Sequence, residues 1–203
     1  MGTIKVAIDS GPLTSGHSVR GIGVHTKELI EKLKKLSTKE VEVCAVDFSS
    51  AGLKGYDIVH YPYFHPFFLT LPFKKPAKKV ILTIHDLIPL IYPKYYPAGV
   101  RGTLRYWLQK FNLRYVDSII TISETSKKDI CRFLGVKPDK VEVIHLAPKK
   151  IFTNLVNDRR LVLIKKRYSL PDQFVLYVGD VNFNKNILGL IKACRLVKTP
   201  LVI

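Results

Sequence analysis

Two neighbouring residues with acid-base chemistry, His85 and Asp86, stand at the end of the apolar run VILTIHDLIP. Imidazole and carboxylate groups exchange protons and bind metal ions, so the pair first suggests catalysis or metal binding. A zinc site needs further ligands at fixed spacing, and the sequence shows none beside the pair. The Gly-x-Ser-x-Gly motif of a serine nucleophile is also absent. We therefore interpret His85 as a neutral group that hydrogen-bonds or polarises a ligand, with Asp86 orienting it or capping the turn.

A glycine-containing segment, SVRGIGVHT, leads into a predicted helix and includes Arg20, Gly21 and Gly23. The amides at a helix N-terminus attract phosphate, and glycine allows a ligand to approach closely. The segment lacks the third glycine of the dinucleotide fingerprint, and no acidic residue marks a ribose site at the expected distance. Two interpretations of this segment therefore remain, a diphosphate-binding site and a plain tight turn.

Polar and aromatic groups also follow other apolar runs. The segment VHYPYFHPFF contains His60, Tyr61, Tyr63 and His65, which suit either a sugar site or a cluster of core aromatics. Lys185 stands just before a predicted helix, where it can bind an anion at the helix start or remain an ordinary solvated lysine. The residues alone leave both choices open.

The elements that must position these groups alternate between strands and helices. The predicted strands have near-continuous apolar centres, which is typical of strands covered on both faces of a parallel sheet. They are Thr3–Ser10, Glu40–Phe48, Tyr56–Pro62, Lys78–Leu87, Asp117–Ser123 and Lys140–Pro148, with helices at 22–36, 100–116 and 124–134. The pattern predicts an α/β fold with a Rossmann-like, doubly wound parallel sheet, in which ligands bind at the carboxyl ends of the strands.

After Pro148 the alternation starts again. A helix-compatible segment, Asp158–Tyr168, is followed by a strand at Gln173–Asp180, a helix at Ile187–Val197 and the beginning of another strand. We predict an N-terminal domain with a crossover at residues 1–168, and the truncated beginning of a second Rossmann-like domain at 169–203. A single complete domain that ends on its last strand is the alternative.

The composition adds a strong positive charge. The 203 residues include 33 Lys and Arg against 16 Asp and Glu, a net charge of +17, which attracts nucleic acid, anionic membranes or phosphorylated small molecules. Nucleic-acid binding is the least favoured of these, because the basic residues are dispersed and the sequence has no known nucleic-acid recognition motif. No apolar run reaches the roughly 20 residues of a membrane span, and the three cysteines suit a reducing compartment, so we expect a cytoplasmic protein.

The helix at 100–116 carries an apolar face flanked by Arg101, Lys110 and Arg114. Packing on the sheet with the cations snorkelling to water is one interpretation, and lying on an anionic membrane is the other. Together with the basic segment PFKKPAKK, the second interpretation is a hypothesis to test. The apolar face consists of Val100, Leu104, Trp107, Leu108, Phe111 and Tyr115.

Four blocks of the sequence carry a family resemblance that extends over nearly the whole chain. They are RGIGVHTKEL, VILTIHDLIP, IITISETSKKDICRFLGVKPDKVEVIHLAP and YVGDVNFNKNILGLIKAC. In this order they resemble the retaining family 4 glycosyltransferases of GT-B fold. The resemblance implies a hexosyltransferase that moves mannose or glucose from a nucleotide-diphosphate sugar to a glycan or lipid-linked acceptor, without a metal cofactor. A non-catalytic module that binds a sugar nucleotide or a partner is the alternative.

The resemblance also implies residue roles. Arg20, Gly21 and Gly23 would lie against the donor diphosphate and sugar, and His85 would contact the transferred sugar. Lys185 would neutralise the negative charge of the leaving diphosphate, which is the electrostatic role of a metal ion in other enzymes.

On the acceptor side we predict His60, Tyr63 and Asp86. Asp180 stands where many members have an arginine, which shifts the binding of the diphosphate to the remaining cations. The family's Glu-x7-Glu element and nucleoside pocket would lie beyond residue 203, so we expect no turnover from this chain alone. An enzyme with a lipid-linked acceptor is expected at the inner face of the membrane.

Overall fold

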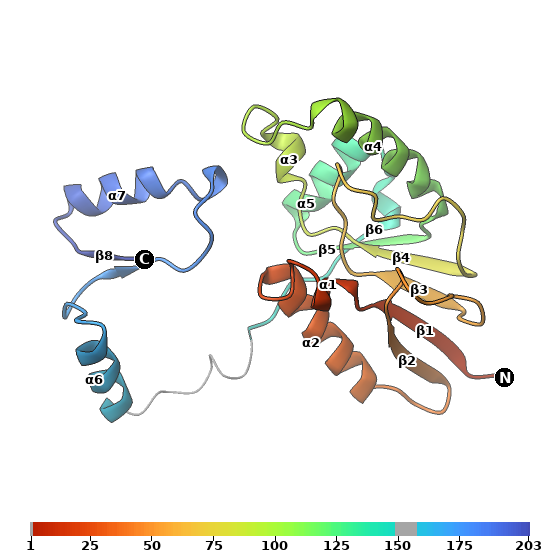
Figure 1. Cartoon of the computed structure of the whole chain (residues 1–203), viewed down its shortest axis with the longest axis horizontal. Helices are drawn as coiled ribbons and strands as arrows, with labels where there is room; N and C mark the ends of the chain where they lie inside the picture. Colours follow the sequence, from red (N-terminus) through yellow and green to blue (C-terminus); the bar gives the residue numbers. More distant parts are fainter. Residues whose placement is uncertain (1, 149–157) are drawn as a thin grey trace. The chain divides into compact units, whose positions relative to one another are not determined.

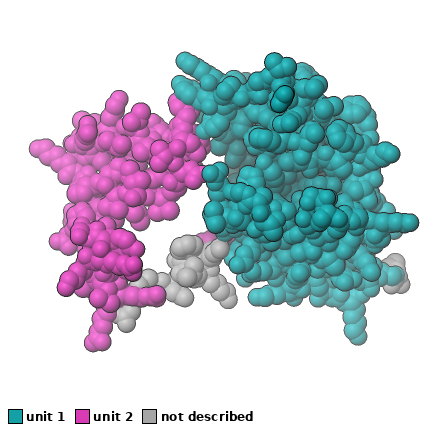
Figure 2. All heavy atoms as spheres, in the orientation of Figure 1, with its two compact units in different colours: residues 1–146 teal, residues 147–203 magenta. Residues whose placement is uncertain are grey.

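The computed structural model describes residues 2–148 and 158–203, which belong to two compact units, 1–146 and 147–203 (Figures 1 and 2). The predicted α/β class with a Rossmann-like, doubly wound parallel sheet is confirmed. The predicted domain limits at 1–168 and 169–203 stay a prediction. Part of the predicted crossover, residues 149–157, lies outside the described residues.

The first unit is built on a six-stranded parallel sheet with the strand order β2-β1-β3-β4-β5-β6. The chain runs outward from β1 to β2 and then returns to the other side of β1, so the order reverses between β1 and β3. At that point Ile8 lies opposite His60. The strands are β1 (Ile4–Asp9), β2 (Val41–Val46), β3 (Ile58–Tyr61), β4 (Lys79–Thr83), β5 (Ser118–Thr121) and β6 (Val141–Val143).

The predicted helices are present, with shorter helices added in the loops. Figure 1 shows α2 beside the β1–β2 half of the sheet, and α4 and α5 beside the β4–β6 half. The helices are α1 (Gly11–Thr14), α2 (Gly21–Lys35), α3 (Ile88–Ile91), α4 (Gly99–Asn112) and α5 (Glu124–Asp129), which continues as a π-helix over Ile130–Leu134. Short 3-10 helices follow at Leu113–Tyr115 and Pro138–Lys140.

The core lies at the centre of the sheet, as the continuous apolar runs predict. The apolar strand residues that are at most 1% exposed are Ala7, Ile8, Val59, Val80, Leu82, Ile119 and Val141. Helical side chains such as Ile130 and Leu134 cover them. Of the three cysteines, Cys44 and Cys131 are half-buried and Cys194 is buried.

Helix α4 has the opposite orientation from the one that its apolar pattern favours. Its buried residues are Gly102, Gln109 and Asn112. Four of the six residues of its apolar face are exposed, namely Val100, Leu104, Trp107 and Phe111. The interpretation that this face packs on the sheet is therefore wrong for these four side chains. The hydrogen bonds of Gln109, described below, give the physical reason.

The second unit contains a parallel strand-helix-strand arrangement. Its elements are α6 (Asp158–Arg167), β7 (Val175–Leu176), a 3-10 helix (Phe183–Lys185), α7 (Ile187–Leu196) and β8 (Leu201–Val202). Val175 lies opposite Leu201 in the two-stranded sheet. The strand predicted at Gln173–Asp180 is much shorter, because β8 offers few residues to pair with it. Within the described part of the chain, no helix has the length and apolar character to span a membrane.

Candidate active site

The carboxyl ends of β1, β3 and β4 converge where the strand order of the sheet reverses. Open α/β sheets bind ligands at such switch points, because the loops there diverge and leave a crevice. His60 lies within β3 opposite Ile81 of β4, and His85 follows β4. The carbonyl of His85 accepts a 2.9 Å hydrogen bond from the hydroxyl of Ser126, at the start of α5. The register therefore brings two of the predicted residues to the same edge.

Three histidine rings form a cluster at this edge. Nε2 of His60 hydrogen-bonds with the Thr83 hydroxyl at 2.8 Å, and both residues are buried. The rings of His25 and His85 meet edge to face, with 4.7 Å between their centroids. Nδ1 of His25 and Nε2 of His85 are buried and have no hydrogen-bond partner among the described residues.

Burial keeps these three rings neutral at ordinary pH. It lowers the pKa of His60 to about 4, an effect to which His25 and His85 add. It also lowers the pKa of His85 to about 4, with His25 adding to the shift and the Pro62 backbone opposing it. The pKa of His25 is lowered by burial as well. The neutral state agrees with the interpretation of His85 as a hydrogen-bonding group.

His25 belongs to the block RGIGVHTKEL, but no role was predicted for it. The signal that could have found it is its place in the first turns of α2, just after the glycine segment at the ligand-binding edge. Asp86 is exposed, and its Oδ1 accepts a 3.1 Å hydrogen bond from the amide of Ile88. This contact corresponds to the predicted capping of the turn.

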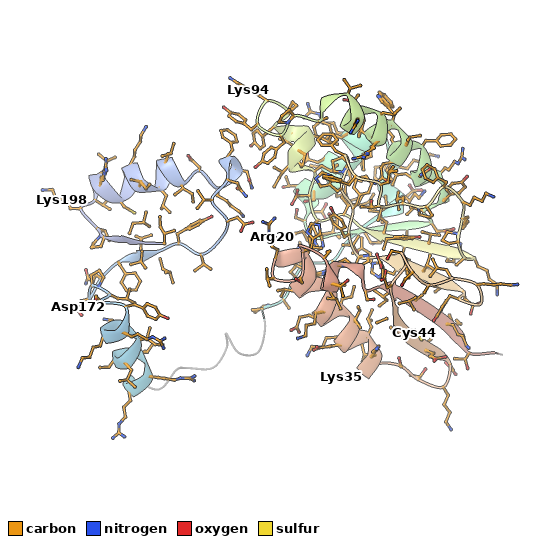
Figure 3. The ribbon with its side chains drawn as sticks, viewed as in Figure 1. Arg20, Lys35, Cys44, Lys94, Asp172 and Lys198 are labelled. Carbon is orange, nitrogen blue, oxygen red and sulfur yellow. The ribbon has the colours of Figure 1, made fainter. Side chains whose placement is uncertain are left out.

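The two glycines in the first turn of α2, Gly21 and Gly23, have different environments. A Cβ on Gly23 would collide with the carbonyl oxygen of His17, whereas a Cβ on Gly21 would meet nothing within 4 Å. The amide of Gly23 also donates to that His17 carbonyl, at 3.1 Å. Gly23 is therefore required by the packing of its own loop. Gly21 and Arg20 are exposed at the start of α2, so a ligand can reach them. Arg20 is labelled in Figure 3.

A cavity of about 830 Å³ lies at the ends of β1 and β3. The rings of His17 and Tyr63, both in its wall, lie 4.7 Å apart. Burial raises the pKa of Tyr63 to about 12, so its hydroxyl keeps its proton. The polar and cationic residues in the wall are Asp9, Ser15, His17, Arg20, Ser49, Tyr61, Tyr63, His65 and Thr70, and the apolar ones include Phe48, Phe68 and Leu71.

The structure brings some of the predicted site residues together and leaves others apart. Arg20 and Tyr63 line the cavity, but His60, His85 and Asp86 are not part of its wall. Lys185 belongs to the second unit, where it is exposed at the end of the 3-10 helix that precedes α7. Among the described residues, no group of three or more His, Cys, Asp or Glu side chains is arranged to hold a metal ion.

Gln109, which the sequence analysis missed, organises one side of the cavity from α4. Its side chain is fully buried, and Oε1 accepts a 3.0 Å hydrogen bond from the amide of Leu71. Nε2 lies 2.7 Å from the carbonyl of Phe68 and 2.6 Å from the hydroxyl of Thr70. It also donates to the carbonyl of His65 at 3.2 Å. The amide therefore supports the loop whose residues form part of the cavity wall.

Asp9 has a similar role at the end of β1 and was also missed. Its Oδ1 accepts hydrogen bonds from the amides of Gly11, at 3.0 Å, and Phe48, at 3.2 Å. One carboxylate thus joins the loops that follow β1 and β2. The available signal was its position, because an acid directly after the first buried strand lies at the ligand-binding edge.

The loop before α7 in the second unit is shaped by two residues with positive φ. Gly179 has a φ of +153° and Asn186 a φ of +49°. The side-chain oxygen of Asn186 caps α7 by accepting from the amide of Gly189 at 3.3 Å. The hydroxyl of Tyr177 donates to the backbone carbonyl of Asp180 at 2.7 Å. These contacts fix the loop that contains Asp180 and Lys185.

Comparison with known proteins finds a family match over most of the first unit. Residues 48–147 match the family model for Glycosyltransferase Family 4. The chain contains a Glycosyltransferase Family 4 domain. The resemblance found in the sequence is therefore confirmed. The matched family 4 domain includes His60, Tyr63, His85 and Asp86, whereas the glycine segment and Lys185 lie outside it.

Two relatives from Escherichia coli resemble part of the chain. The serotype-specific mannosyltransferase WbdA is 27% identical over 135 residues, which cover 66% of this chain and 16% of WbdA. The O-antigen chain mannosyltransferase B is 27% identical over 123 residues, which cover 59% of this chain and 31% of that protein. The chain thus spans less than a third of the length of either relative.

Two solved structures also resemble the chain. The first is a glycosyltransferase from Rickettsia africae ESF-5, at 16% identity and a TM-score of 0.49, covering 97% of this chain and 57% of the other. The second is the wall teichoic acid polymerase TagF, at 14% identity and a TM-score of 0.45, covering 96% of this chain and 54% of the other.

Proposed function

We propose that the chain is part of a two-domain GT-B glycosyltransferase that transfers a hexose with retention of configuration. The donor is a nucleotide-diphosphate sugar of mannose or glucose, and the acceptor is a glycan or lipid-linked sugar. The observation that carries this proposal is the cavity of about 830 Å³ at the switch point of a family 4 domain. The two mannosyltransferase relatives favour mannose as the transferred sugar.

The chemistry of the cavity wall suits a carbohydrate acceptor. Aromatic rings such as those of Tyr63 and Phe48 can stack on the apolar faces of a sugar ring. The hydroxyls of Ser49 and Thr70 and the carboxylate of Asp9 can hydrogen-bond with its hydroxyl groups. In this proposal His60 supports the cavity wall indirectly, through its hydrogen bond with Thr83. Asp86 stabilises the turn beside the acceptor.

His85 is proposed to bind a hydroxyl group of the transferred sugar through its free ring nitrogen. Its lowered pKa disfavours a role that needs an imidazolium ion, because the ring gains a proton only in acid. The acceptor oxygen forms the new bond to the anomeric carbon on the face from which the diphosphate leaves. The departing diphosphate takes the acceptor proton and the electron pair of the broken bond.

Cationic side chains are proposed to stabilise the departing diphosphate in place of a metal cofactor. Arg20 and Lys185 supply positive charge, and Gly21 allows the phosphates to approach the amides at the start of α2. Asp180 replaces the arginine that many members have, so Lys185 gains importance. We place the reaction in the cytoplasm, at the inner face of the membrane.

Activity measurements with a panel of GDP and UDP sugars test this proposal. Residues 1–203 and the longest protein that contains them are assayed in parallel for donor hydrolysis and for transfer. We expect transfer from one donor by the longer protein and no turnover by residues 1–203 alone. Turnover of no sugar by either protein would favour the alternative, a non-catalytic module that binds a sugar nucleotide or a partner.

Two variants test the role of His85. We expect His85→Ala to lower kcat by about 10²-fold, the typical effect of removing one hydrogen bond to the transition state. His85→Gln keeps a neutral hydrogen-bonding side chain and should retain much more activity than the alanine variant. Equal and complete loss in both variants would instead indicate a proton shuttle, and full activity of His85→Ala would remove His85 from the site.

A further inference from the structure

The exposed apolar residues of α4 form one continuous stripe. The exposed fractions are 89% for Val100, 63% for Leu104, 59% for Trp107 and 56% for Phe111. Their spacing of four, three and four residues places them on a single helical face. Because Gly102, Gln109 and Asn112 occupy the buried face, nothing within the described first unit covers this stripe. Four large apolar side chains in a row on the surface indicate an interaction site.

Basic side chains lie directly beside the aromatic rings of the stripe. The guanidinium carbon of Arg114 lies 3.5 Å from the centroid of the Phe111 ring. The ammonium nitrogen of Lys110 lies 5.6 Å from the centroid of the Trp107 ring. Cations that cover an apolar ring and keep their charge in water are typical of helices at a membrane interface.

The charge of the surrounding sequence is strongly one-sided. Between Asp57 and Asp117 the sole acidic residue is Asp86. The same interval contains Lys74, Lys75, Lys78, Lys79, Lys94, Arg101, Arg105, Lys110 and Arg114. Lys94 lies at the outer edge of the unit, in the loop between α3 and α4 (Figure 3). This excess of positive charge complements an anionic surface.

A basic cavity of about 550 Å³ adjoins the C-terminal end of α4. Lys110 and Arg114, which flank the stripe, also line this cavity. Of the acids in its wall, Asp117 is already paired with Lys75 at 2.9 Å and Lys79 at 3.3 Å. The complete set of charged residues in the wall is Lys110, Arg114, Asp117, Lys137, Asp139 and Lys140. The cavity therefore has the charge and position to receive lipid phosphate groups.

We propose that α4 lies in the plane of an anionic phospholipid bilayer, with the stripe in the boundary between headgroups and acyl chains. The basic cavity then receives phosphate groups of the same lipids. The helix has 14 residues, about 21 Å at 1.5 Å per residue, which is too short to cross the bilayer but suits a helix that lies on it. The flanking cations favour a bilayer over a protein partner, because the apolar rings and the positive charges occur together along one helix.

The docking proposal stands independently of the proposed function, but it has a consequence for that function. Phe68 lines the cavity at the switch point, and its ring lies 6.0 Å from the guanidinium carbon of Arg105 on α4. The candidate acceptor cavity therefore adjoins the helix that would lie on the bilayer. This arrangement would give a lipid-linked acceptor a short path to the cavity.

Vesicle binding and tryptophan fluorescence test the proposal on the chain of residues 1–203. Trp107 is the one tryptophan of the sequence, so the emission reports on the stripe alone. We expect sedimentation with vesicles of phosphatidylglycerol and phosphatidylcholine at low salt, and little with phosphatidylcholine alone. On binding to the anionic vesicles, the Trp107 emission should shift to the blue, and an aqueous quencher should reduce the Trp107 fluorescence less than it does in the free protein. High salt should weaken the binding.

Two substitutions in the stripe and one matched control complete the test. Trp107→Gln and Phe111→Gln should each weaken vesicle binding by about tenfold or more, because each removes a large apolar group from the interface. Leu36→Gln changes a residue that is 71% exposed at the end of α2, and it should leave binding unchanged. An unchanged melting temperature shows that each variant is folded.

Three results would overturn the proposal. The first is an absence of sedimentation with anionic vesicles at low salt. The second is vesicle binding that neither Trp107→Gln nor Phe111→Gln weakens, because charge alone would then bind the membrane. The third is a blue shift that depends on protein concentration and needs no vesicles, because a second copy of the chain would then cover the stripe.

Discussion

Oε1 of Gln109 accepts a 3.0 Å hydrogen bond from the backbone amide of Leu71, which lies 38 positions away in the sequence. This bond joins the buried face of α4 to the loop that lines the candidate acceptor cavity. The opposite face of α4 carries the exposed stripe with Trp107. One helix therefore supports the cavity with its inner face and offers an interaction surface with its outer face.

Replacing Gln109 should loosen this loop. Gln109→Leu keeps the approximate volume but leaves the amide of Leu71 and the carbonyl of Phe68 without their buried partners. We expect the free energy of unfolding to fall by about 2–4 kcal/mol, measured by urea denaturation. Thr103→Ala, an exposed change on the same helix, should alter it by less than about 0.5 kcal/mol. Equal stability of the two variants would show that the amide does not hold the loop.

The two glycines in the first turn of α2 should respond differently to alanine. In Gly23→Ala the new methyl group collides with the His17 backbone, so we expect a loss of about 1–3 kcal/mol in the free energy of unfolding. Gly21→Ala has open space and should fold as stably as the original protein. If Gly21 lies against the donor diphosphate, this variant should nevertheless bind the donor more weakly. Calorimetric titration with nucleotide sugars measures that effect, and unchanged affinity would contradict the role of Gly21.

The stability of the first unit should fall in acid. His60 and His85 have pKa values of about 4 in the folded protein, against about 6.5 in an unfolded chain. The unfolded chain therefore binds more protons between these values, and the stability rises with pH through this range. It is fully present above pH 6.5 and is lost as the pH falls through 4. At roughly 1.4 kcal/mol per pKa unit, the loss should amount to several kcal/mol.

Denaturation at a series of pH values checks this dependence. His60→Asn removes one buried imidazole. It should therefore reduce the slope of the free energy of unfolding against pH between pH 6.5 and pH 4, whatever it does to the absolute stability. His145→Asn, which changes an exposed ring, should leave the slope as it is. An unaltered slope in His60→Asn would show that other groups cause the dependence.

Removal of metal ions should not affect transfer, because the proposed diphosphate site uses side-chain cations. In the longest protein that contains this chain, we expect EDTA to leave kcat and KM unchanged. Lys185→Ala should lower kcat/KM by about 10²-fold, and Lys192→Ala, an exposed lysine on α7, should not change it. Activity that EDTA abolishes and Mg²⁺ restores would contradict the proposal.

Much of the first unit is predictable from the sequence because its strands are buried on both faces. Continuous apolar runs around Val59, Leu82 and Ile119 mark the central strands, and the polar groups that follow them fall at the expected edge. The positions of His60 and His85 follow from the same register. The cavity is less predictable, because residues such as Asp9 and Gln109 act through distant backbone partners.

The amino-acid pattern by itself determined the α/β class, the order of the strands along the chain and the edge at which polar groups gather. Local apolar periodicity suffices for these features, because burial on a sheet is a property of each run. Only the tertiary structure decided which face of α4 is buried. The hydrogen bonds of Gln109 with the loop at 65–71 turn its polar side inward and leave Trp107 exposed. Periodicity shows that a helix has two faces, but the partners that each face meets come from segments far away in the sequence.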